Sequence, residues 1–213
     1  MAEMLWIWPA LTLCALALLL LAESRQSHVG KWLFKPLASL GFILTALACG
    51  ALDSVYGIII LVGLVLSLVG DVLLIPRRHL TFLAGLVAFL LGHVAYVVAF
   101  VVHGFLPLAA ILAGLALVGF GLVLARRDLR RIDAGMHGPV VVYGIVITAM
   151  LALAVGATAA GGSWLIVTGA ALFYLSDLSV ARDRLIETSF LQRAWGLPAY
   201  FIGQLMLAAS VMA

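Results

Sequence analysis

Charged residues are scarce in this sequence. Lys and Arg together number 12 and Asp and Glu nine in a chain of 213 residues, so charged side chains make up only 10% of it. A water-facing surface carries about 25–35% charged residues, which excludes a soluble globular domain. The mean hydropathy of +1.26 instead indicates an integral membrane protein. The net charge of +3 gives no indication of nucleic-acid binding.

Cysteine is almost absent, with only Cys14 and Cys49, both inside apolar runs. Two such residues provide neither a disulfide framework nor a metal-ligand spacing, and no glycine-rich phosphate-binding loop is present. We therefore expect no metal and no cofactor. The first apolar run, 5–21, also lacks a basic segment before it and a small-residue cleavage site after it. We interpret it as a retained span and not as a signal peptide.

Long apolar runs make up most of the chain. Runs of about 17–23 residues cross a hydrocarbon core of roughly 30 Å as helices, and the loops between them are too short to hold a second domain. We therefore expect residues 1–213 to form one all-α, multi-pass membrane domain. Short turns predict helical hairpins of spans 2–3, 4–5 and 6–7. The eight predicted spans are 5–22, 34–51, 56–75, 80–102, 106–125, 139–159, 163–181 and 195–212.

The basic residues are confined to alternate loops. All 12 Lys and Arg follow spans 1, 3, 5 and 7, and the other loops and both termini have none. The positive-inside rule then places these four loops in the cytoplasm and both termini outside. We expect the inner (plasma) membrane of a bacterial cell. The densest loop, 126–133, is interpreted as a solvated topology anchor, the alternative being a patch for anionic lipid head groups.

An internal repeat is predicted. Residues 88–93 in span 4 (AFLLGH) are similar to residues 199–204 in span 8 (AYFIGQ), and each segment follows an acid-bearing span and its basic loop. Spans 2 and 6 both open near a proline, Pro36 and Pro139. Because spans 1–4 and 5–8 run in the same directions, this pattern predicts a parallel four-plus-four duplication.

Two aspartates interrupt apolar spans, Asp71 in span 3 and Asp177 in span 7. A carboxylate inside a membrane costs several kcal/mol unless it is paired or protonated, so each marks a candidate functional site. Asp71 precedes Arg77, and Asp177 precedes Arg182, by about 9 and 8 Å at 1.5 Å per helical residue. The two acids therefore lie at matched depth in the cytoplasmic half, which predicts one shared catalytic site.

Other polar residues are predicted to converge on the same cavity, open to the cytoplasm, as substrate-binding or supporting groups. Each also has an alternative role. A lone His or Gln in a span is often an interhelical hydrogen-bonding group. Lys35 can be a boundary anchor, and Asp183 can form a local ion pair with its neighbouring arginines. The predicted supporting residues are Lys35, Ser67, His93, Tyr96, Tyr143, Ser176, Asp183, Tyr200 and Gln204.

The ordered polar and aromatic positions resemble the YhhN family, which includes the vertebrate lysoplasmalogenases. The resemblance rests on Ser67…Gly70-Asp71, on Phe82…Gly85…Phe89…His93…Tyr96, on Phe173…Ser176-Asp177…Ala181, on Tyr200…Gln204 and on Lys35-Pro36. It covers essentially the whole chain. It implies an eight-span membrane enzyme that hydrolyses the vinyl ether bond of a lysoplasmalogen, releasing a fatty aldehyde and a glycerophospho-alcohol.

Two buried acids suit such chemistry. A vinyl ether resists bases and nucleophiles but opens when its β-carbon is protonated, because an oxocarbenium ion forms and water adds to it. The reaction needs a protonated carboxylic acid and a carboxylate, as in glycosidases, and no cofactor. We favour Asp177 as the donor, held neutral by Ser176 and Tyr174. The alkenyl chain is expected among Phe82, Phe89 and Phe173, with the phosphate near Lys35 and the basic loops.

Two other classes of function use the same features. A proton-coupled transporter or flippase for an amphiphilic substrate would also place acids inside the membrane and would use a parallel repeat. A lipid-binding structural protein would use them only as hydrogen-bonding groups. Release of aldehyde by purified protein in detergent separates hydrolysis from transport, because transport requires two compartments.

Overall fold

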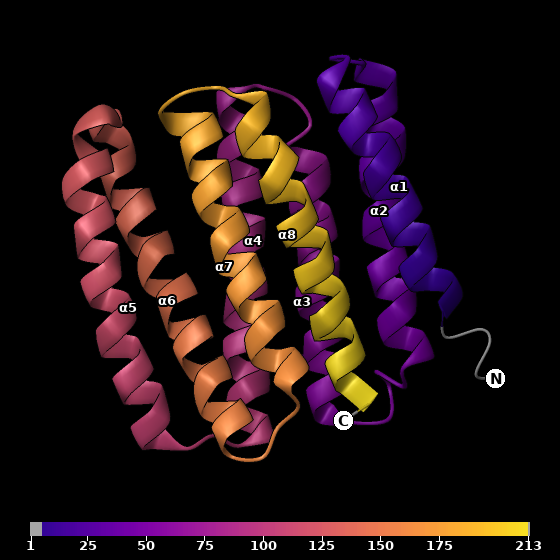
Figure 1. The fold of residues 1–213 in the computed structure, drawn as a ribbon, viewed down its shortest axis with the longest axis vertical. Helices are drawn as coiled ribbons and strands as arrows, with labels where there is room; N and C mark the ends of the chain where they lie inside the picture. Colours follow the sequence, from indigo (N-terminus) through magenta and orange to yellow (C-terminus); the bar gives the residue numbers. More distant parts are fainter. Residues whose placement is uncertain (1–5, 213) are drawn as a thin grey trace.

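The computed structural model describes residues 6–212, and over this range the chain is helical with no β-strand. Eight helices within this range are long and apolar enough to cross a membrane, which makes this an integral multi-pass membrane protein. The helices are α1 Ile7–Ser24, α2 His28–Ala48, α3 Val55–Leu73, α4 His79–His103, α5 Pro107–Asp128, α6 His137–Ala159, α7 Trp164–Leu185 and α8 Phe190–Ala209 (Figure 1).

Serine caps explain where several helices begin. The side-chain oxygen of Ser27 accepts the backbone N–H of Gly30 at the start of α2, and the Ser189 side chain accepts that of Leu191 at the start of α8. Such caps satisfy donors that the first helical turn leaves free. These helices therefore begin six and five residues before the hydropathy-based starts at 34 and 195, outside the apolar run itself.

Some predicted boundaries were wrong for the same reason. Lys35 and Pro36 lie inside α2 and not at its start, and α7 continues past 181 to include Asp183 and Arg184. Hydropathy marks where a helix crosses the apolar core, whereas the helix itself continues until it is capped. As a result, several basic residues project from helix ends and not from loops.

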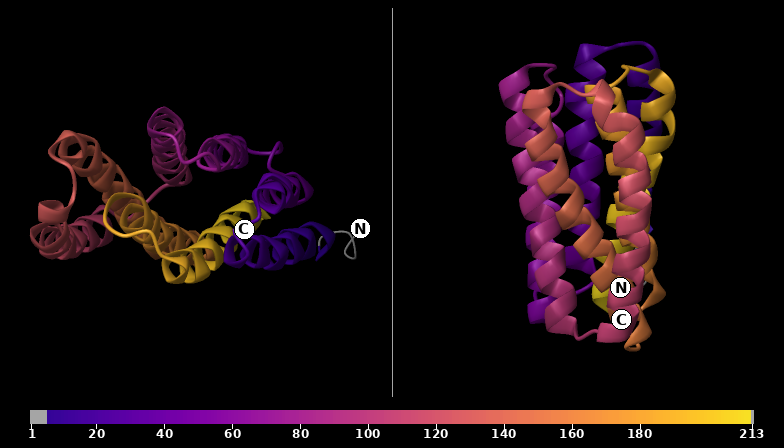
Figure 2. Two further views of the ribbon diagram at one scale, coloured as in Figure 1. Left: turned by 90° about the horizontal axis from the view of Figure 1, so that it is seen from above. Right: turned by 90° about the vertical axis from the view of Figure 1, so that its left-hand side faces the viewer.

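Six helices form a closed ring. Going round it, α2 packs on α3, α3 on α4, α4 on α6, α6 on α7, α7 on α8, and α8 on α2. Outside the ring, α1 packs on α2 and α8, and α5 packs on α6. Seen end-on, α3 and α4 lie on one side and α7 and α8 on the other, with α1–α2 and α5–α6 at the two ends (Figure 2).

The strongest neighbouring pairs are α1–α2, α3–α4, α5–α6 and α7–α8. The predicted hairpin of spans 4 and 5 is therefore wrong: the short turn at Gly104 joins α4 to α5, but the two helices separate after it. The faces of α4 that point inward are taken by α3 and α6, and α5 contacts α6 at the edge of the bundle. The predicted contacts of spans 2–3 and 6–7 are confirmed.

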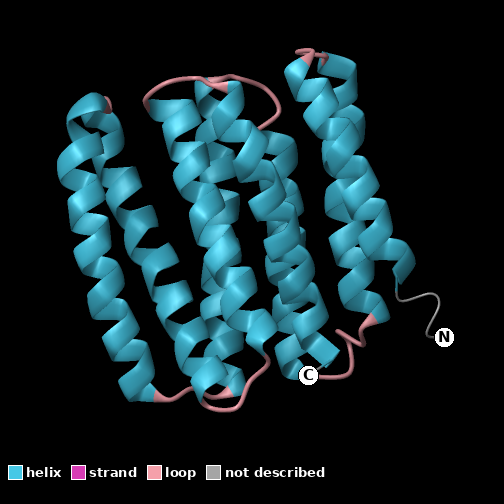
Figure 3. Cartoon of the chain, in the orientation of Figure 1, coloured by secondary structure: helices cyan, strands magenta, loops and turns pink. Residues whose placement is uncertain are grey.

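The loops that follow α1, α3, α5 and α7 lie at one end of the bundle, and the C-terminal end of α8 lies at the other (Figure 3). All the basic residues belong to the first end, either in these loops or on the helix turns beside them. Placing that end in the cytoplasm stays a prediction of the positive-inside rule.

Each half of the chain contains a similar close helix crossing at a pair of glycines, as the predicted repeat would lead one to expect. At the crossing of α3 and α4, a Cβ added to Gly92 would lie 3.3 Å from the carbonyl oxygen of Gly63. At the crossing of α7 and α8, a Cβ added to Gly203 would lie 2.9 Å from that of Gly169. Gly92 and Gly203 hold the same place in the aligned segments 88–93 and 199–204, and Gly63 and Gly169 each lie eight residues before an intramembrane acid. The duplication itself stays a prediction, and these two crossings support it.

Candidate functional site

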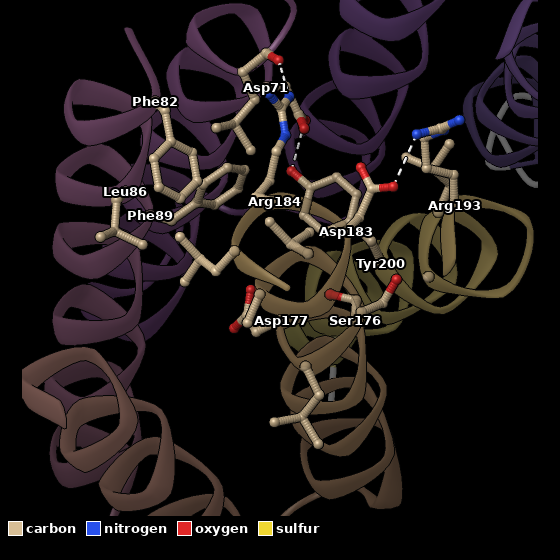
Figure 4. A pocket seen from close by; sticks show the side chains of 18 of the residues that line it. Asp71, Phe82, Leu86, Phe89, Ser176, Asp177, Asp183, Arg184, Arg193 and Tyr200 are labelled. Atoms are coloured by element: carbon tan, nitrogen blue, oxygen red, sulfur yellow. Dashed lines mark hydrogen bonds and ion pairs between the residues drawn. The ribbon is translucent and has the colours of Figure 1, made fainter. Parts of the chain in front are cut away.

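A cavity of about 200 Å³ lies inside the helix ring, toward the end that carries the basic loops. Every ring helix contributes to its lining, and both intramembrane acids, Asp71 and Asp177, lie on its wall. In Figure 4, Phe82, Leu86 and Phe89 project from α4 on one side, and Ser176 and Asp177 lie on the other. The cavity therefore brings the two predicted catalytic residues to one space.

Asp71 is surrounded by hydrogen-bond donors. Its Oδ1 lies 3.1 Å from the Lys35 ammonium nitrogen, and its Oδ2 accepts bonds of 2.6 Å from the hydroxyls of Ser39 and Tyr200. The Lys35 ammonium also donates to the backbone carbonyl of Asp71 at 3.2 Å. Only 2% of the Asp71 side chain is exposed. A buried ion pair with additional hydrogen bonds is the arrangement that makes a carboxylate tolerable away from water.

Asp177 has different partners. Its Oδ1 accepts a 3.2 Å hydrogen bond from the Tyr143 hydroxyl, and its Oδ2 lies 3.0 Å from Nε2 of His93. The latter two atoms are not aligned for a hydrogen bond, and each is buried without another partner among residues 6–212. Oδ2 of Asp177 is therefore the least firmly held of the four carboxylate oxygens on the two acids.

The proton on His93 can be placed from its other contact. Nδ1 lies 2.7 Å from the backbone carbonyl oxygen of Phe89, which only accepts, so Nδ1 carries a hydrogen. In a neutral ring Nε2 is then a lone-pair acceptor. Nε2 of His93 therefore faces Oδ2 of Asp177 across 3.0 Å, the one close approach between a ring nitrogen and an acid on this cavity among residues 6–212.

Aromatic rings line the cavity that the two acids share. The Phe173 ring lies against His93, with centroids 4.2 Å apart, and meets Tyr200 edge-on at 5.5 Å. Phe89 contacts both Phe173 and Tyr200, with centroids 6.2 and 5.8 Å apart. These contacts make the cavity wall apolar between two polar ends, with Asp71–Tyr200 at one and Asp177–His93 at the other.

Three predicted supporting residues form a separate polar layer. The Tyr96 hydroxyl donates to Oε1 of Gln204 at 2.6 Å, and the Gln204 amide donates to the Ser67 hydroxyl at 3.3 Å. All three are fully buried, and none lines the cavity. His93 likewise does not line the cavity, so these four predicted supporting residues lie behind its wall.

Ser176 and Asp183 line the cavity at different levels. The Ser176 hydroxyl donates to the Phe173 carbonyl at 2.8 Å and not to Asp177. Asp183 lies at the rim, 2.8 Å from Arg193 and 3.5 Å from Arg77. Arg193 continues this chain of ion pairs to Glu23 at 3.1 Å. Asp183 is thus a rim residue, and its ion pairs are with Arg193 and Arg77 and not with its neighbours in sequence, Arg182 and Arg184.

Each of the two acids contacts side chains from both halves of the chain. Asp71 on α3 is held by α2 of its own half and by α8 of the other half. Asp177 on α7 is held by α6 of its own half and by α4 of the other. Under the predicted repeat α2 corresponds to α6 and α8 to α4. The site therefore forms where the two halves meet.

Sequence reasoning missed three contributors to the site. Ser39, which contacts Asp71, lies one helical turn after Lys35, and that i, i+4 spacing was the available signal. Glu23 and Arg193 lie far apart in sequence, and no local pattern links them. Tyr143 and Tyr200, by contrast, lie where they were expected, each donating to one acid.

The fold and site together define an integral membrane protein of eight helices with two acids on one intramembrane cavity. The sequence matches the YhhN family over residues 30–211, and the chain belongs to that family. The matched range includes every residue of the site described above except Glu23. No curated protein and no solved structure gives a match.

Proposed function

We propose that this protein is a membrane hydrolase that cleaves the vinyl ether bond of lysoplasmalogen-type lysolipids. The observation that carries the proposal is the contrast between the two acids on one cavity. Asp71 lies among an ammonium and hydroxyl donors, whereas Asp177 lies beside a histidine, a side chain that can exchange a proton with it. One acid is thus arranged as a carboxylate and the other as a proton donor.

In the proposed reaction, Asp177 delivers the proton that it shares with His93 to the β-carbon of the vinyl ether. The resulting oxocarbenium ion is stabilised by the Asp71 carboxylate. Water adds to the cationic carbon and loses its proton to the Asp177–His93 pair, and the hemiacetal collapses to an aldehyde and an alcohol. One water is consumed, and the pair regains the proton that it gave up.

His93 is a positioning residue in this scheme because it lies behind the cavity wall. Its Nδ1–H bond to the Phe89 carbonyl fixes the ring, and its stacking on Phe173 keeps Nε2 at Asp177. Tyr143 holds the other oxygen of Asp177. These contacts supply the orientation that general acid catalysis requires.

The cavity lining suits the reacting end of a single-chain lipid. Phe82, Phe89 and Phe173 provide an apolar wall beside the two acids. A volume of about 200 Å³ is smaller than the roughly 300–1,000 Å³ of sites that enclose a whole drug-sized ligand. The cavity thus accommodates the vinyl ether and adjacent atoms, while the rest of the alkenyl chain lies outside it among the apolar helix surfaces.

The proposal is tested with purified protein in detergent and three lysolipids that differ only in the chain linkage. The 1-alkenyl lipid is expected to release a fatty aldehyde of full chain length, and in D₂O that aldehyde carries one deuterium at its second carbon. The saturated 1-alkyl and the 1-acyl lipids are expected to stay intact, because neither forms the cation by carbon protonation. Release of fatty acid from the acyl lipid, or no aldehyde from the alkenyl lipid, contradicts the proposal.

A proton-coupled transporter is the second candidate function. It is favoured by the position of the acids at the contact of the two predicted repeats, where transporters of repeated architecture bind their substrates. The same detergent assay separates the two functions. A transporter leaves the alkenyl lipid chemically unchanged in one compartment and moves it, or a related amphiphile, only across a sealed vesicle membrane.

A further inference from the structure

A second cavity, of about 270 Å³, adjoins the acid-lined one at the end that carries the basic loops. Arg77, Phe82, Asp183, Arg184 and Leu185 line both cavities, so the two meet along these side chains. The residues that line only the second cavity are Arg78, His79, Met136 and Thr188. The outer cavity is therefore mainly basic, whereas the inner one holds the two acids and the aromatic wall.

Arg184 lies at the junction of the two cavities, among the side chains labelled in Figure 4. Among residues 6–212, no carboxylate lies within ion-pair distance of its guanidinium. Its Nη2 donates to the backbone carbonyl of Leu74, and its guanidinium carbon lies 6.0 Å from the centroid of the Phe82 ring. These contacts hold the group in place but leave most of its five N–H donors free and its charge without a carboxylate among residues 6–212.

The other charges of the outer cavity do not offset Arg184. Among residues 6–212, Asp183 is the one acid that lines the outer cavity, and its carboxylate lies closer to Arg193, at 2.8 Å, than to Arg77, at 3.5 Å. Arg78 is the N-cap residue of α4, and its side chain makes no capping hydrogen bond. The first-turn N–H groups of α4 therefore lie beside the outer cavity without a side-chain cap. Three arginines against one shared carboxylate leave an excess of positive charge, which favours an anion.

Within residues 6–212, the acids on the two cavities already have partners that compete with an ammonium group. Four carboxylates line the two cavities, and each already has a cation or a donor beside it. Glu23 lies with Lys31 and Arg193, Asp71 with Lys35, Asp183 with Arg193 and Arg77, and Asp177 with His93 and Tyr143. Lys35, once expected to bind phosphate, is likewise held by Asp71. The outer cavity thus offers free donors to a phosphate, whereas its carboxylate, Asp183, is already paired with two arginines. Oδ2 of Asp177, which has no hydrogen bond, lines only the inner cavity.

We propose that the outer cavity binds the phosphate of a lysolipid through Arg184, with Arg77 and Arg78, and that the protein recognises this phosphate and not the amine of the head group. This phosphate site rests on the proposed hydrolase function, because a phosphate bound at Arg184 places the adjoining glycerol and vinyl ether at the inner cavity. A guanidinium matches phosphate oxygens with two parallel hydrogen bonds. A lipid phosphate monoester, with its extra negative charge, is then bound at least as tightly as a phosphocholine.

The proposal is tested by the binding of non-hydrolysable 1-alkyl lipids to the full-length protein in detergent. The three probes are the alkyl phosphate monoester, the alkyl phosphocholine and the alkyl glycerol that lacks phosphate. We expect the two phosphate lipids to bind about ten-fold or more tightly than the alkyl glycerol. Arg184→Met is expected to remove that advantage, because the charged hydrogen bonds from the guanidinium to the phosphate are lost. Arg130→Met, at an exposed arginine that lines neither cavity, is expected to leave it unchanged.

Several outcomes would overturn the proposal. The first is a much higher affinity for the phosphocholine lipid than for the phosphate monoester. The others are an Arg184→Met variant that keeps the preference for phosphate lipids and an Arg130→Met variant that loses it. If Arg184→Met does not fold, Arg184→Lys is used, and it is expected to keep part of the preference because the charge remains without the planar fork. Competition by inorganic phosphate as strong as that by the lipid would show a site for free phosphate instead. Because the probes cannot be hydrolysed, failure of the hydrolase proposal would leave these results interpretable.

Discussion

Replacing Asp177 by Asn is expected to lower kcat for a 1-alkenyl lysolipid by about 10² to 10⁴-fold, the usual contribution of general acid catalysis. Asn keeps the size of the side chain and still contacts Tyr143 and His93, but it cannot protonate carbon. KM is expected to change little, because in the proposed reaction Asp177 acts on the reacting carbon and does not bind the head group. Steady-state aldehyde release by purified variant and wild-type protein measures both parameters.

Two controls make this result specific. Asp53→Asn removes an exposed carboxylate in the turn between α2 and α3 and is expected to keep wild-type kinetics. His93→Gln leaves the donor in place but removes its positioning partner. It is expected to lower kcat less than Asp177→Asn does and to change the dependence of the rate on pH. An Asp177→Asn protein with kcat near that of the wild type would show that the proton comes from elsewhere.

Replacing Asp71 by Asn is expected to have two separate effects. Turnover should nearly disappear, because the oxocarbenium ion loses its carboxylate. The protein should also lose stability by about 3–5 kcal/mol, since removing one partner of a buried ion pair leaves the other charge uncompensated. Here the remaining charge is the Lys35 ammonium, whose side chain is only 12% exposed.

The double variant Lys35→Met/Asp71→Asn separates the two roles. Replacing a buried ion pair by groups of similar volume is often neutral for stability, so the double variant is expected to recover much of the thermal stability lost by the single one. Activity should stay low, because the carboxylate is still missing. Thermal unfolding in detergent and aldehyde release are measured on the same preparations. Recovery of activity together with stability would make Asp71 a structural residue only.

The sequence predicts the fold class and the helix number because both depend on local apolar length. Each span is long enough to cross the membrane on its own, so counting such spans needs no tertiary information. Helix ends were less predictable, since capping by Ser27 and Ser189 extends α2 and α8 beyond their apolar runs. The packing of α4 away from α5 also depends on which helix faces meet, and a short turn at Gly104 says nothing about that.

The sequence predicts which residues belong to the candidate site better than it predicts which of them contact one another. Asp71 and Asp177 stand out because a carboxylate in an apolar run is costly, and both line the same cavity. Their partners come from other helices, so no spacing along the chain identifies them. The sequence favoured Asp177 as proton donor for the wrong reason: Ser176 bonds a backbone carbonyl, and it is His93 and Tyr143 that contact the acid.

The contrast between Lys35 and Arg184 illustrates the same limit. Both are basic residues near the membrane boundary in the sequence, and Lys35 was the expected phosphate ligand. In the structure Lys35 neutralises Asp71, whereas Arg184 has no acid beside it among residues 6–212. Which cation is free for a ligand depends on where the carboxylates of other helices lie, and only the folded arrangement contains that information.

The central claim is that two acids on one intramembrane cavity carry out the hydrolysis. The most direct measurement is aldehyde release from a 1-alkenyl lysophospholipid by purified Asp71→Asn/Asp177→Asn protein, compared with wild type in the same detergent. Size-exclusion behaviour and thermal unfolding identify folded protein in both samples. The account predicts steady aldehyde release by the wild type and none above the uncatalysed background by folded double variant. Release by the double variant at a rate near that of the wild type would contradict it.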